Sequence, residues 1–444
     1  MQQKRIPATV LLLMGIPCLA QNAGHARLAG AAVRQTVAPG KMSLIAVNSL
    51  PNAVCTLRAQ DDSGAVRTLK LYADDDGEVR FHVRPSAETD NAPNLQLSCE
   101  ANDKVMVHGV ELRAGTAADT VAARVRPKGR VRPALTGDLM LPSQEELLSR
   151  GYPMRPDPEQ MPEAYATWVR MVTSEATEIA PRTVARPDFH AGPTHIGPIM
   201  RPNAQNSTTW SGFALYRDPS ISLLTANSPK PYVSVSGEWY VPSVTGEIGI
   251  QDHSVLWVGM DGLTSTDIVQ GGTGQDAMGM NSQGTQWTVA TIYGWTEFSP
   301  LGMQQLTSFK VSPGDHMMSQ VIMGYVGPQG AIEGALGACY LYNLTTKTTV
   351  WVYVLPPAGT SFNGSSAEWI MERPTINGAL PDLSDYNAAT MFNAWAQRAD
   401  GTEVASSGNP NSVRITMTDD LGVILSTVTA VTDSSMAFYW IEFR

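Results

Sequence analysis

The stretch from Trp287 to Phe298 reads WTVATIYGWTEF and alternates between two sets of side chains. One set includes Trp287, Tyr293, Trp295 and Glu297. A period of two residues is that of a β-strand, whose successive side chains point to opposite faces of a sheet. A strand of this length with aromatic residues on one face predicts a large antiparallel sheet.

Similar stretches follow one another from Trp210 to the C-terminus and predict further strands. These lie at residues 232–241, 317–325, 338–343, 348–355, 412–417, 421–431 and 436–443. The number of strands exceeds what a standard immunoglobulin-like unit needs. We therefore expect one antiparallel double-sheet domain over residues 204–444.

The composition of the whole chain agrees with an all-β protein. The 444 residues are 43% hydrophobic and only 16% charged, and they include 38 Gly and 30 Pro. A net charge of −10 argues against a nucleic-acid partner. Beyond the N-terminus no run of apolar residues is long enough to span a membrane, so we expect no membrane association after signal removal.

The N-terminus has the pattern of a secretory signal. Lys4 and Arg5 precede an apolar run over residues 6–20 that ends in small residues. We expect a signal peptide over residues 1–26 and a secreted, extracellular protein.

Residues 27–115 contain short alternating segments separated by turn residues, which predict a small β-sandwich domain. Cys55 and Cys99 lie in two of these segments, and we expect a disulfide that joins the two sheets of the sandwich. Cys339 lies in an apolar strand and is expected to be a buried thiol.

Residues 116–203 predict a basic linker and a helical pro-segment. The basic residues are Arg124, Arg126, Lys128, Arg130 and Arg132. Helices are expected from Ser143 and from Pro162, followed by an exposed, Pro-rich stretch over residues 179–203. Charge divides at this point: residues 201–444 hold 9 Lys and Arg against 20 Asp and Glu, a balance of −11, whereas residues 1–200 balance at +1.

The motifs of several enzyme classes are missing from the sequence. There is no His-Glu-x-x-His, the seven His lack metal-ligand spacing, and neither a Gly-x-Ser-x-Gly elbow nor a phosphate-binding Gly loop occurs. We therefore expect no metal and no cofactor.

Eight short motifs in the C-terminal half occur in a specific order. They read WSG at 210–212, VSGEWYVPS at 235–243, WVGMDG at 257–262, VQGG at 269–272, YGWTEFSP at 293–300, VSPGD at 311–315, YNLTT at 342–346 and SAEWI at 366–370. This series resembles the eqolisin family of glutamic peptidases (peptidase G1), which are secreted acid endopeptidases. The resemblance implies a concanavalin-like jelly roll of two packed antiparallel sheets, with protein or peptide substrates.

The resemblance also implies a catalytic pair. The family's glutamine falls on Gln270 and its glutamate on Glu368. A carboxylate can deprotonate a water poised against a peptide carbonyl, and a neutral amide can donate a hydrogen bond to the resulting oxyanion. Gln275 is the alternative glutamine, because it also has a glycine neighbour.

Four further residues are candidates around this pair. The resemblance implies that Trp295 packs on the substrate and that Glu297 orients Gln270 or binds the peptide. Asp261 is expected either to support the site by hydrogen bonding or simply to form a turn before a glycine. Glu372 shares a strand face with Glu368 and is therefore a candidate for the border of the cleft, but it is close to Pro374, and we favour a solvated strand end.

The charge division suggests that the protein is made as a zymogen. We expect the basic pro-segment to dock in cis on the acidic peptidase domain, and acid to weaken this contact so that autolysis removes the segment. We expect a monomer. The alternative function is a non-catalytic carbohydrate- or protein-binding module, because the same jelly-roll architecture serves binding as well.

Overall fold

The computed structural model describes residues 26–89, 91–115, 128–192, 204–216, 230–263, 267–324, 337–360 and 362–441. The predicted signal peptide lies outside these residues except for Ala26, and so do Arg124 and Arg126 of the basic run. No helix in the described part of the chain is long and apolar enough to cross a membrane.

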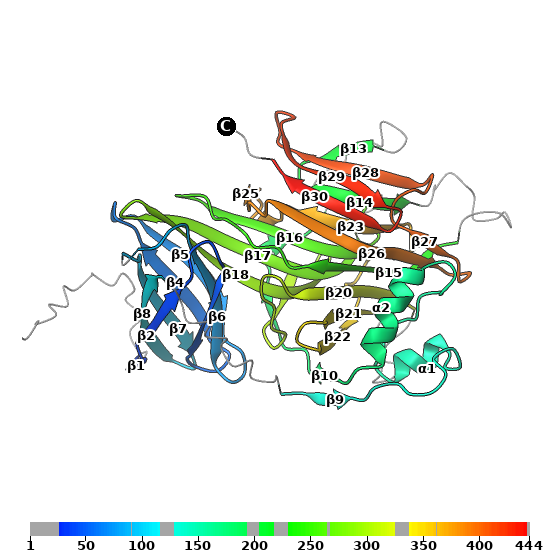
Figure 1. Cartoon of the computed structure of the whole chain (residues 1–444), viewed down its shortest axis with the longest axis horizontal. Coiled ribbons are helices and arrows are strands. Elements are labelled where there is room, and N and C mark those ends of the chain that lie inside the picture. The colour runs from blue at the N-terminus through cyan, green and yellow to red at the C-terminus, as the bar shows by residue number, and fades with distance from the viewer. Residues whose placement is uncertain are drawn as a thin grey trace, which may run out of the picture.

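The N-terminal residues form a twisted sheet, drawn in blue in Figure 1, with strand order β1-β8-β7-β4-β5 and with β2 also paired to β8. The strands are β1 (Ala26–Ala29), β2 (Val33–Val37), β4 (Val54–Gln60), β5 (Val66–Tyr72), β7 (Asn94–Ala101) and β8 (Lys104–Ala114). Their alternating burial matches the alternation in the sequence.

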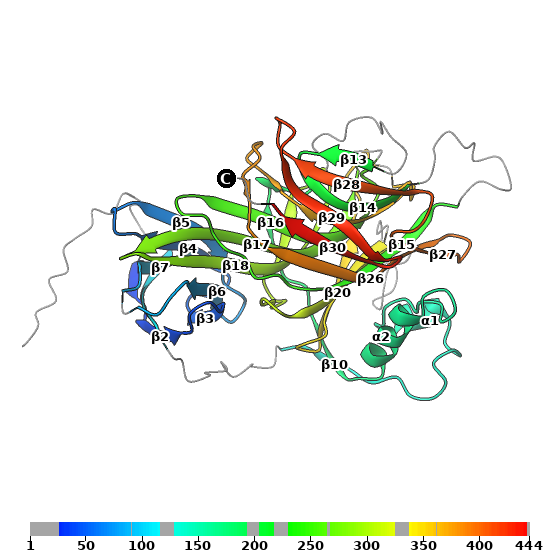
Figure 2. The same ribbon diagram turned by 45° about the horizontal axis from the view of Figure 1, so that its top comes forward.

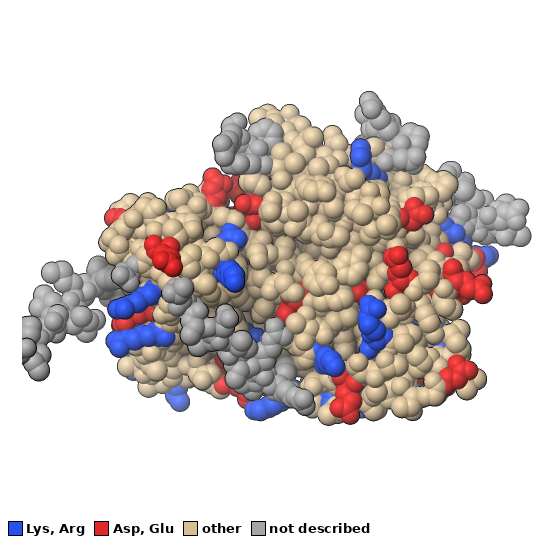
Figure 3. Space-filling model, viewed as in Figure 1, with Lys and Arg blue, Asp and Glu red and all other residues tan. Residues whose placement is uncertain are grey.

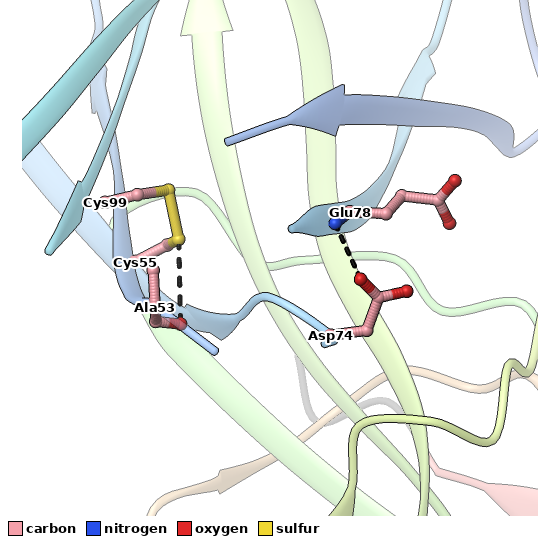
Figure 4. Close-up of a disulfide and its surroundings, with 5 residues drawn as sticks. All are labelled: Ala53, Cys55, Asp74, Glu78 and Cys99. Carbon is pink, nitrogen blue, oxygen red and sulfur yellow. Dashed lines mark hydrogen bonds between the residues drawn. A yellow bond between two sulfur atoms is a disulfide. The ribbon is translucent and has the colours of Figure 1, made fainter. Parts of the chain in front are cut away.

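The predicted disulfide between Cys55 and Cys99 is confirmed, but its position in the fold differs from the expectation. The two cysteines lie directly opposite each other on β4 and β7, neighbouring strands of one sheet (Figure 4). The bond therefore cross-links a strand pair and does not join two sheets. Close by, the Asp74 carboxylate accepts a hydrogen bond from the Glu78 backbone N–H at 2.7 Å.

The second layer of this N-terminal region is shared with the C-terminal part of the chain. The hairpin of β3 (Ser43–Asn48) and β6 (Glu78–Pro85) pairs with β18 (Thr285–Phe298), and β18 pairs along its whole length with β17 (Val269–Ser282). In Figure 2 the long β17–β18 hairpin reaches over the N-terminal strands. Its far end contributes buried side chains to the N-terminal core, namely Met278, Met280, Trp287 and Val289.

Both expected helices are confirmed. Helix α1 (Gln144–Ser149) is capped by Ser143, whose hydroxyl accepts a hydrogen bond from the Glu146 N–H, and α2 (Pro162–Val172) begins with a proline at its first position. Three short strands connect the segment that contains these helices to the C-terminal part of the chain, which we call the large body. They are β9 (Arg130–Arg132), β10 (Ala176–Ile179) and β11 (Thr183–Arg186). β10 pairs with β9 and β22, and β11 pairs with β19.

Two packed sheets make up the large body, which confirms the jelly-roll expectation. The first, the site sheet, runs β11-β19-β18-β17-β16-β23-β14-β28. Its remaining strands are β14 (Trp210–Tyr216), β16 (Gln251–Met260), β19 (Met303–Leu306), β23 (Ser366–Glu372) and β28 (Ser412–Thr418), with β13 (Ala204–Ser207) paired to β28 and β25 (Asp382–Leu383) to β16.

The second sheet runs β29-β30-β26-β15-β20-β21-β22-β10-β9. Its strands are β15 (Tyr232–Tyr240), β20 (His316–Met323), β21 (Gly337–Asn343), β22 (Thr348–Val354), β26 (Ala388–Arg398), β29 (Ile424–Thr432) and β30 (Ser435–Trp440), with β27 (Glu403–Ala405) paired to β26. The main core lies between the two sheets and includes Trp239, Val258, Trp369 and Cys339. The expected buried thiol at Cys339 is thereby confirmed, and burial raises its pKa to about 12.

Charged residues are sparse and scattered on the face shown in Figure 3, where most of the surface is uncharged. An ion pair links the N-terminal region to the large body: Lys310 Nζ lies 2.8 Å from Asp74 Oδ2.

Candidate active site

Strand pairing places three of the predicted site residues in one row across the site sheet. Glu368 on β23 pairs with Gly259 on β16, Gly259 pairs with Gln270 on β17, and Gln270 pairs with Glu297 on β18. Residues directly opposite each other in antiparallel strands point to the same face. The three side chains therefore share the face turned away from the main core, which we call the site face.

Gly259 opens the space between the two proposed catalytic side chains. A Cβ at this position would lie 2.7 Å from the Trp257 ring and 3.1 Å from the Cβ of Gln270. The absence of a side chain leaves room for Glu368 and Gln270 to approach a common point above the sheet.

The next row on the site face is apolar. Trp295, Gly272, Trp257 and Ile370 pair across β18, β17, β16 and β23. The three larger side chains are fully buried and belong to one hydrophobic cluster. Trp295 therefore lines the site face beside the predicted pair, next to Glu297.

A segment that precedes the large body lies on the site face. We call residues 186–192 the strap; it contains the two-residue strand β12 (Phe189–His190), which pairs with β24 (Thr375–Ile376). Phe189 and Ala191 are fully buried in the same apolar cluster as Trp295. The expectation of an exposed, irregular stretch is wrong for the strap, while residues 193–203 lie outside the described part of the chain.

The strap binds the site residues through its main chain. The Gln270 amide donates a hydrogen bond from Nε2 to the carbonyl oxygen of Ala191. The Ala191 N–H donates to Glu297 Oε2 at 2.8 Å, and the Gly192 N–H donates to Glu372 Oε1 at 2.8 Å. The main chain of two consecutive residues is thus held by three site-face side chains.

Glu372 was expected to be solvated, and the structure overturns this expectation. Its side chain is fully buried, with Oε1 on the strap and Oε2 accepting a hydrogen bond from Trp257 Nε1 at 2.7 Å. Pro374 correctly indicated that β23 ends here, but a sequence gives no sign that a distant segment covers this end.

Gln275 points to the opposite face of β17 from Gln270. The two are five residues apart on a strand whose pairing with β18 has no register shift, so their side chains alternate to opposite sides. Gln275 Oε1 accepts a hydrogen bond from the Ser254 hydroxyl at 3.0 Å on the side of the main core. The geometry therefore favours Gln270 over Gln275.

Asp261 lies at the end of β16 and binds the loop that leads into β23. Its carboxylate accepts hydrogen bonds from the N–H groups of Asn363 at 2.9 Å and Gly364 at 3.2 Å, and from the Ser365 hydroxyl at 2.7 Å. Asp261 has a positive φ of 60°, so it serves in a turn as well. Through this loop Asp261 fixes the start of the strand that carries Glu368.

The carboxyl groups on the site face are buried, and their pKa values reflect it. Burial raises the pKa of Glu297 to about 7, although the neighbouring His190 and the Ala191 N–H oppose the shift. Burial also raises the pKa of Glu368 and of Glu372 well above the ordinary value. Hydrogen bonding to Glu297 raises the pKa of His190, whose Nδ1 lies 3.5 Å from Glu297 Oε1. These carboxyl groups favour their neutral form while the strap is in place.

Among the residues that the structure describes, no three His, Cys, Asp or Glu side chains are arranged to hold a metal ion.

The family model of the Peptidase A4 family matches residues 209–440, which is more than half of the chain. The chain belongs to the Peptidase A4 family. It is a peptide hydrolase, as the order of the eight motifs predicted, and the non-catalytic alternative is set aside.

Solved glutamic peptidases are similar to about half of this chain. A scytalido-glutamic peptidase bound to a transition-state analog inhibitor is 19% identical, with a TM-score of 0.41, over 53% of this chain and 98% of that one. The eqolisin SCP-B in complex with the tripeptide Ala-Ile-His is 18% identical, with a TM-score of 0.38, over 53% and 98%. Aspergilloglutamic peptidase from Aspergillus niger is 23% identical, with a TM-score of 0.35, over 43% and 99%. A search of curated proteins found no match.

Replacing Gly259 by Ala should reduce peptide hydrolysis by roughly 100-fold, because the new Cβ displaces Gln270 or the Trp257 ring. The measurement is kcat/KM together with a thermal melt. Gly109→Ala on β8 is the matched control, since a Cβ there meets nothing within 4 Å. Equal activity of the two variants would show that the space above Gly259 is not needed.

The raised pKa of Glu297 predicts how stability depends on pH. A carboxyl whose folded-state pKa is about 7, against an ordinary 4.5, stabilises the fold fully below pH 4.5, and this contribution is lost as pH rises through 7. The loss is on the order of 3 kcal/mol. Urea unfolding of the intact chain at pH 4.5 and pH 8 should show a smaller difference for Glu297→Gln than for wild type. An unchanged difference would contradict the assignment.

Proposed function

We propose that the chain is a secreted glutamic endopeptidase that works in acid with Gln270 and Glu368 as its catalytic pair. The observation that carries this proposal is their common row on the site face, separated only by Gly259. Both side chains are fully buried, so small changes in their surroundings have large electrostatic effects.

The chemistry follows from the two side-chain types. Ionised Glu368 accepts a proton from a water molecule as that water attacks the peptide carbonyl, and it later returns the proton to the leaving amine. Gln270 Nε2 donates a hydrogen bond to the oxyanion that forms on the same carbonyl.

The strap supports the proposal that the protein is made as a zymogen with its pro-segment in cis. Ala191 presents its carbonyl to Gln270 as a substrate would, and the strap therefore blocks the substrate path. Glu368 is also fully buried, and its raised pKa keeps it neutral in acid and unable to act as a base in this state. In this state the site is closed both sterically and electrostatically.

The pKa directions argue against the expectation that acid loosens the strap. Burial raises the pKa of Glu297 and of Glu372, both of which the strap contacts, and loss of the strap would return these two carboxyl groups toward solvent and lower pKa values. By linkage, proton uptake then favours the strapped form. We therefore propose that cleavage of the chain, and not acid alone, removes the strap.

Secretion rests on the N-terminal signal pattern of residues 1–26. The Cys55–Cys99 disulfide fits an oxidising compartment.

The catalytic pair is tested by casein hydrolysis as a function of pH. Gln270→Ala and Glu368→Gln should each lose at least about 100-fold in kcat while a cooperative thermal melt shows that each variant is folded. Gln275→Ala, on the opposite face, is the matched control and should retain activity. We expect acid activity that survives EDTA and thiol reagents and that pepstatin inhibits poorly. Neutral activity abolished by EDTA, or near wild-type activity of Gln270→Ala, would overturn the assignment.

Maturation is tested by shifting the purified full chain from pH 7 to pH 4 and mapping new N-termini. We expect a cut between Ile179 and Trp210, at the Ala191–Gly192 bond whose carbonyl faces Gln270, with a rate that rises with protein concentration. Glu368→Gln should stay intact alone at pH 4 and be cut when matured wild type is added. Conversion of Glu368→Gln by itself, or no cut in this window, would contradict the zymogen proposal.

A further inference from the structure

The first residue of the strap holds a buried ion pair on the site face. Arg186 is 7% exposed, and its Nη1 lies 3.0 Å from Asp276 Oδ2 on β17. The same nitrogen donates a hydrogen bond to the Tyr293 hydroxyl at 2.9 Å. The guanidinium carbon also lies 4.2 Å from the centre of the Phe189 ring and 5.3 Å from that of Tyr293.

The groups around this guanidinium form a preorganised acceptor. Asp276 is 2% exposed, and its Oδ1 contacts both His253 Nδ1 at 2.8 Å and the Tyr293 hydroxyl at 2.9 Å. Oδ2 is left for the cation. Burial by itself would raise the pKa of Asp276, but the charges of Arg186 and His253 outweigh it and hold the pKa below its ordinary value.

The two halves of this ion pair come from different parts of the chain. Asp276, His253 and Tyr293 stand on β17, β16 and β18 of the matched family region, on the same face as Gln270. Arg186 belongs to the strap, five residues before the carbonyl that Gln270 binds. Once the strap leaves, Asp276 keeps His253 and the Tyr293 hydroxyl on Oδ1 but loses the guanidinium on Oδ2, and an incompletely paired charge in the protein interior is costly.

We propose that Asp276, with Tyr293 and His253, forms a subsite for a basic substrate side chain, Arg in preference to Lys, five positions before the residue that supplies the scissile carbonyl. This inference rests on the proposed function and deepens it by naming a class of substrate. Arg is favoured because its planar group can bind the carboxylate and hydroxyl together while stacking on Tyr293. The strap shows the arrangement that such a substrate would adopt.

The experiment uses the full chain after acid maturation and peptides that carry the sequence of residues 185–195 and differ only at the position of Arg186. Arg, Lys and Gln are compared at that position. We expect kcat/KM in the order Arg, Lys, Gln, with Arg at least about 10-fold above Gln. If the enzyme hydrolyses casein but cuts the Arg and Gln peptides at equal rates, the subsite proposal is wrong and the proposed function still holds.

Variants test whether Asp276 and Tyr293 are the residues that cause the preference for Arg over Gln. Asp276→Asn should bring the Arg-to-Gln ratio close to one, and Tyr293→Phe should reduce it. Asp252→Asn is the matched control, since Asp252 is an equally buried aspartate on the other face of β16, and it should keep the wild-type ratio. A ratio that persists in a folded Asp276→Asn protein would overturn the assignment to Asp276. If neither peptide nor casein is cut, the proposed function and the subsite both fail.

Discussion

The site depends on one constraint, the unbroken register between β23, β16, β17 and β18. The pairing of β17 with β18 runs from Val269 and Phe298 to Ser282 and Thr285 without a shift, and β16 pairs with both its neighbours in the same way. A slip of one residue would turn Gln270 into the main core and bring Gly271 to the site face. Register shifts do occur in this protein, but where β15 meets β26 and where β29 meets its neighbours, away from this row. The register of the strands therefore decides which side chains reach the site face.

The same ladder explains why the N-terminal region and the peptidase body are built as one structure. The face of the β17–β18 hairpin that carries Gln270, Asp276 and Tyr293 continues, farther along, as Met278 and Trp287 in the N-terminal core. The alternation of side chains does not change between the two, so one strand face carries the candidate active site at one end and contributes to a hydrophobic core at the other. The N-terminal core buries the far end of the hairpin whose other end carries the site residues. The N-terminal region is thus part of the support of the site.

Much of this could be predicted from local sequence and some could not. Alternation over residues 287–298 predicted the long strand with Trp295 and Glu297 on one of its faces, and the ordered motifs singled out Gln270 and Glu368. The alternation of a regular strand is enough to place Gln270 and Gln275 on opposite faces, because the two residues are five positions apart. The strap, the burial of Glu372 and the Arg186–Asp276 pair depend on contacts between segments about 90 to 180 residues apart. No periodicity encodes such contacts, and the placement of the disulfide within one sheet was hidden for the same reason.

Two different kinds of interaction hold the strap, and they respond differently to pH. The pKa of Asp276 lies below its ordinary value, so the Arg186–Asp276 ion pair stays charged farther into acid than a pair with an ordinary carboxyl group would. The carboxyls of Glu297 and Glu372 accept hydrogen bonds from the strap's main chain, and burial favours their neutral form. Acid therefore leaves the Arg186–Asp276 ion pair intact. It also protonates Glu297 and Glu372, which removes the free-energy cost of burying their charges. Because both interactions hold the strap in acid, they support the proposal that cleavage of the chain, and not acid alone, removes the strap.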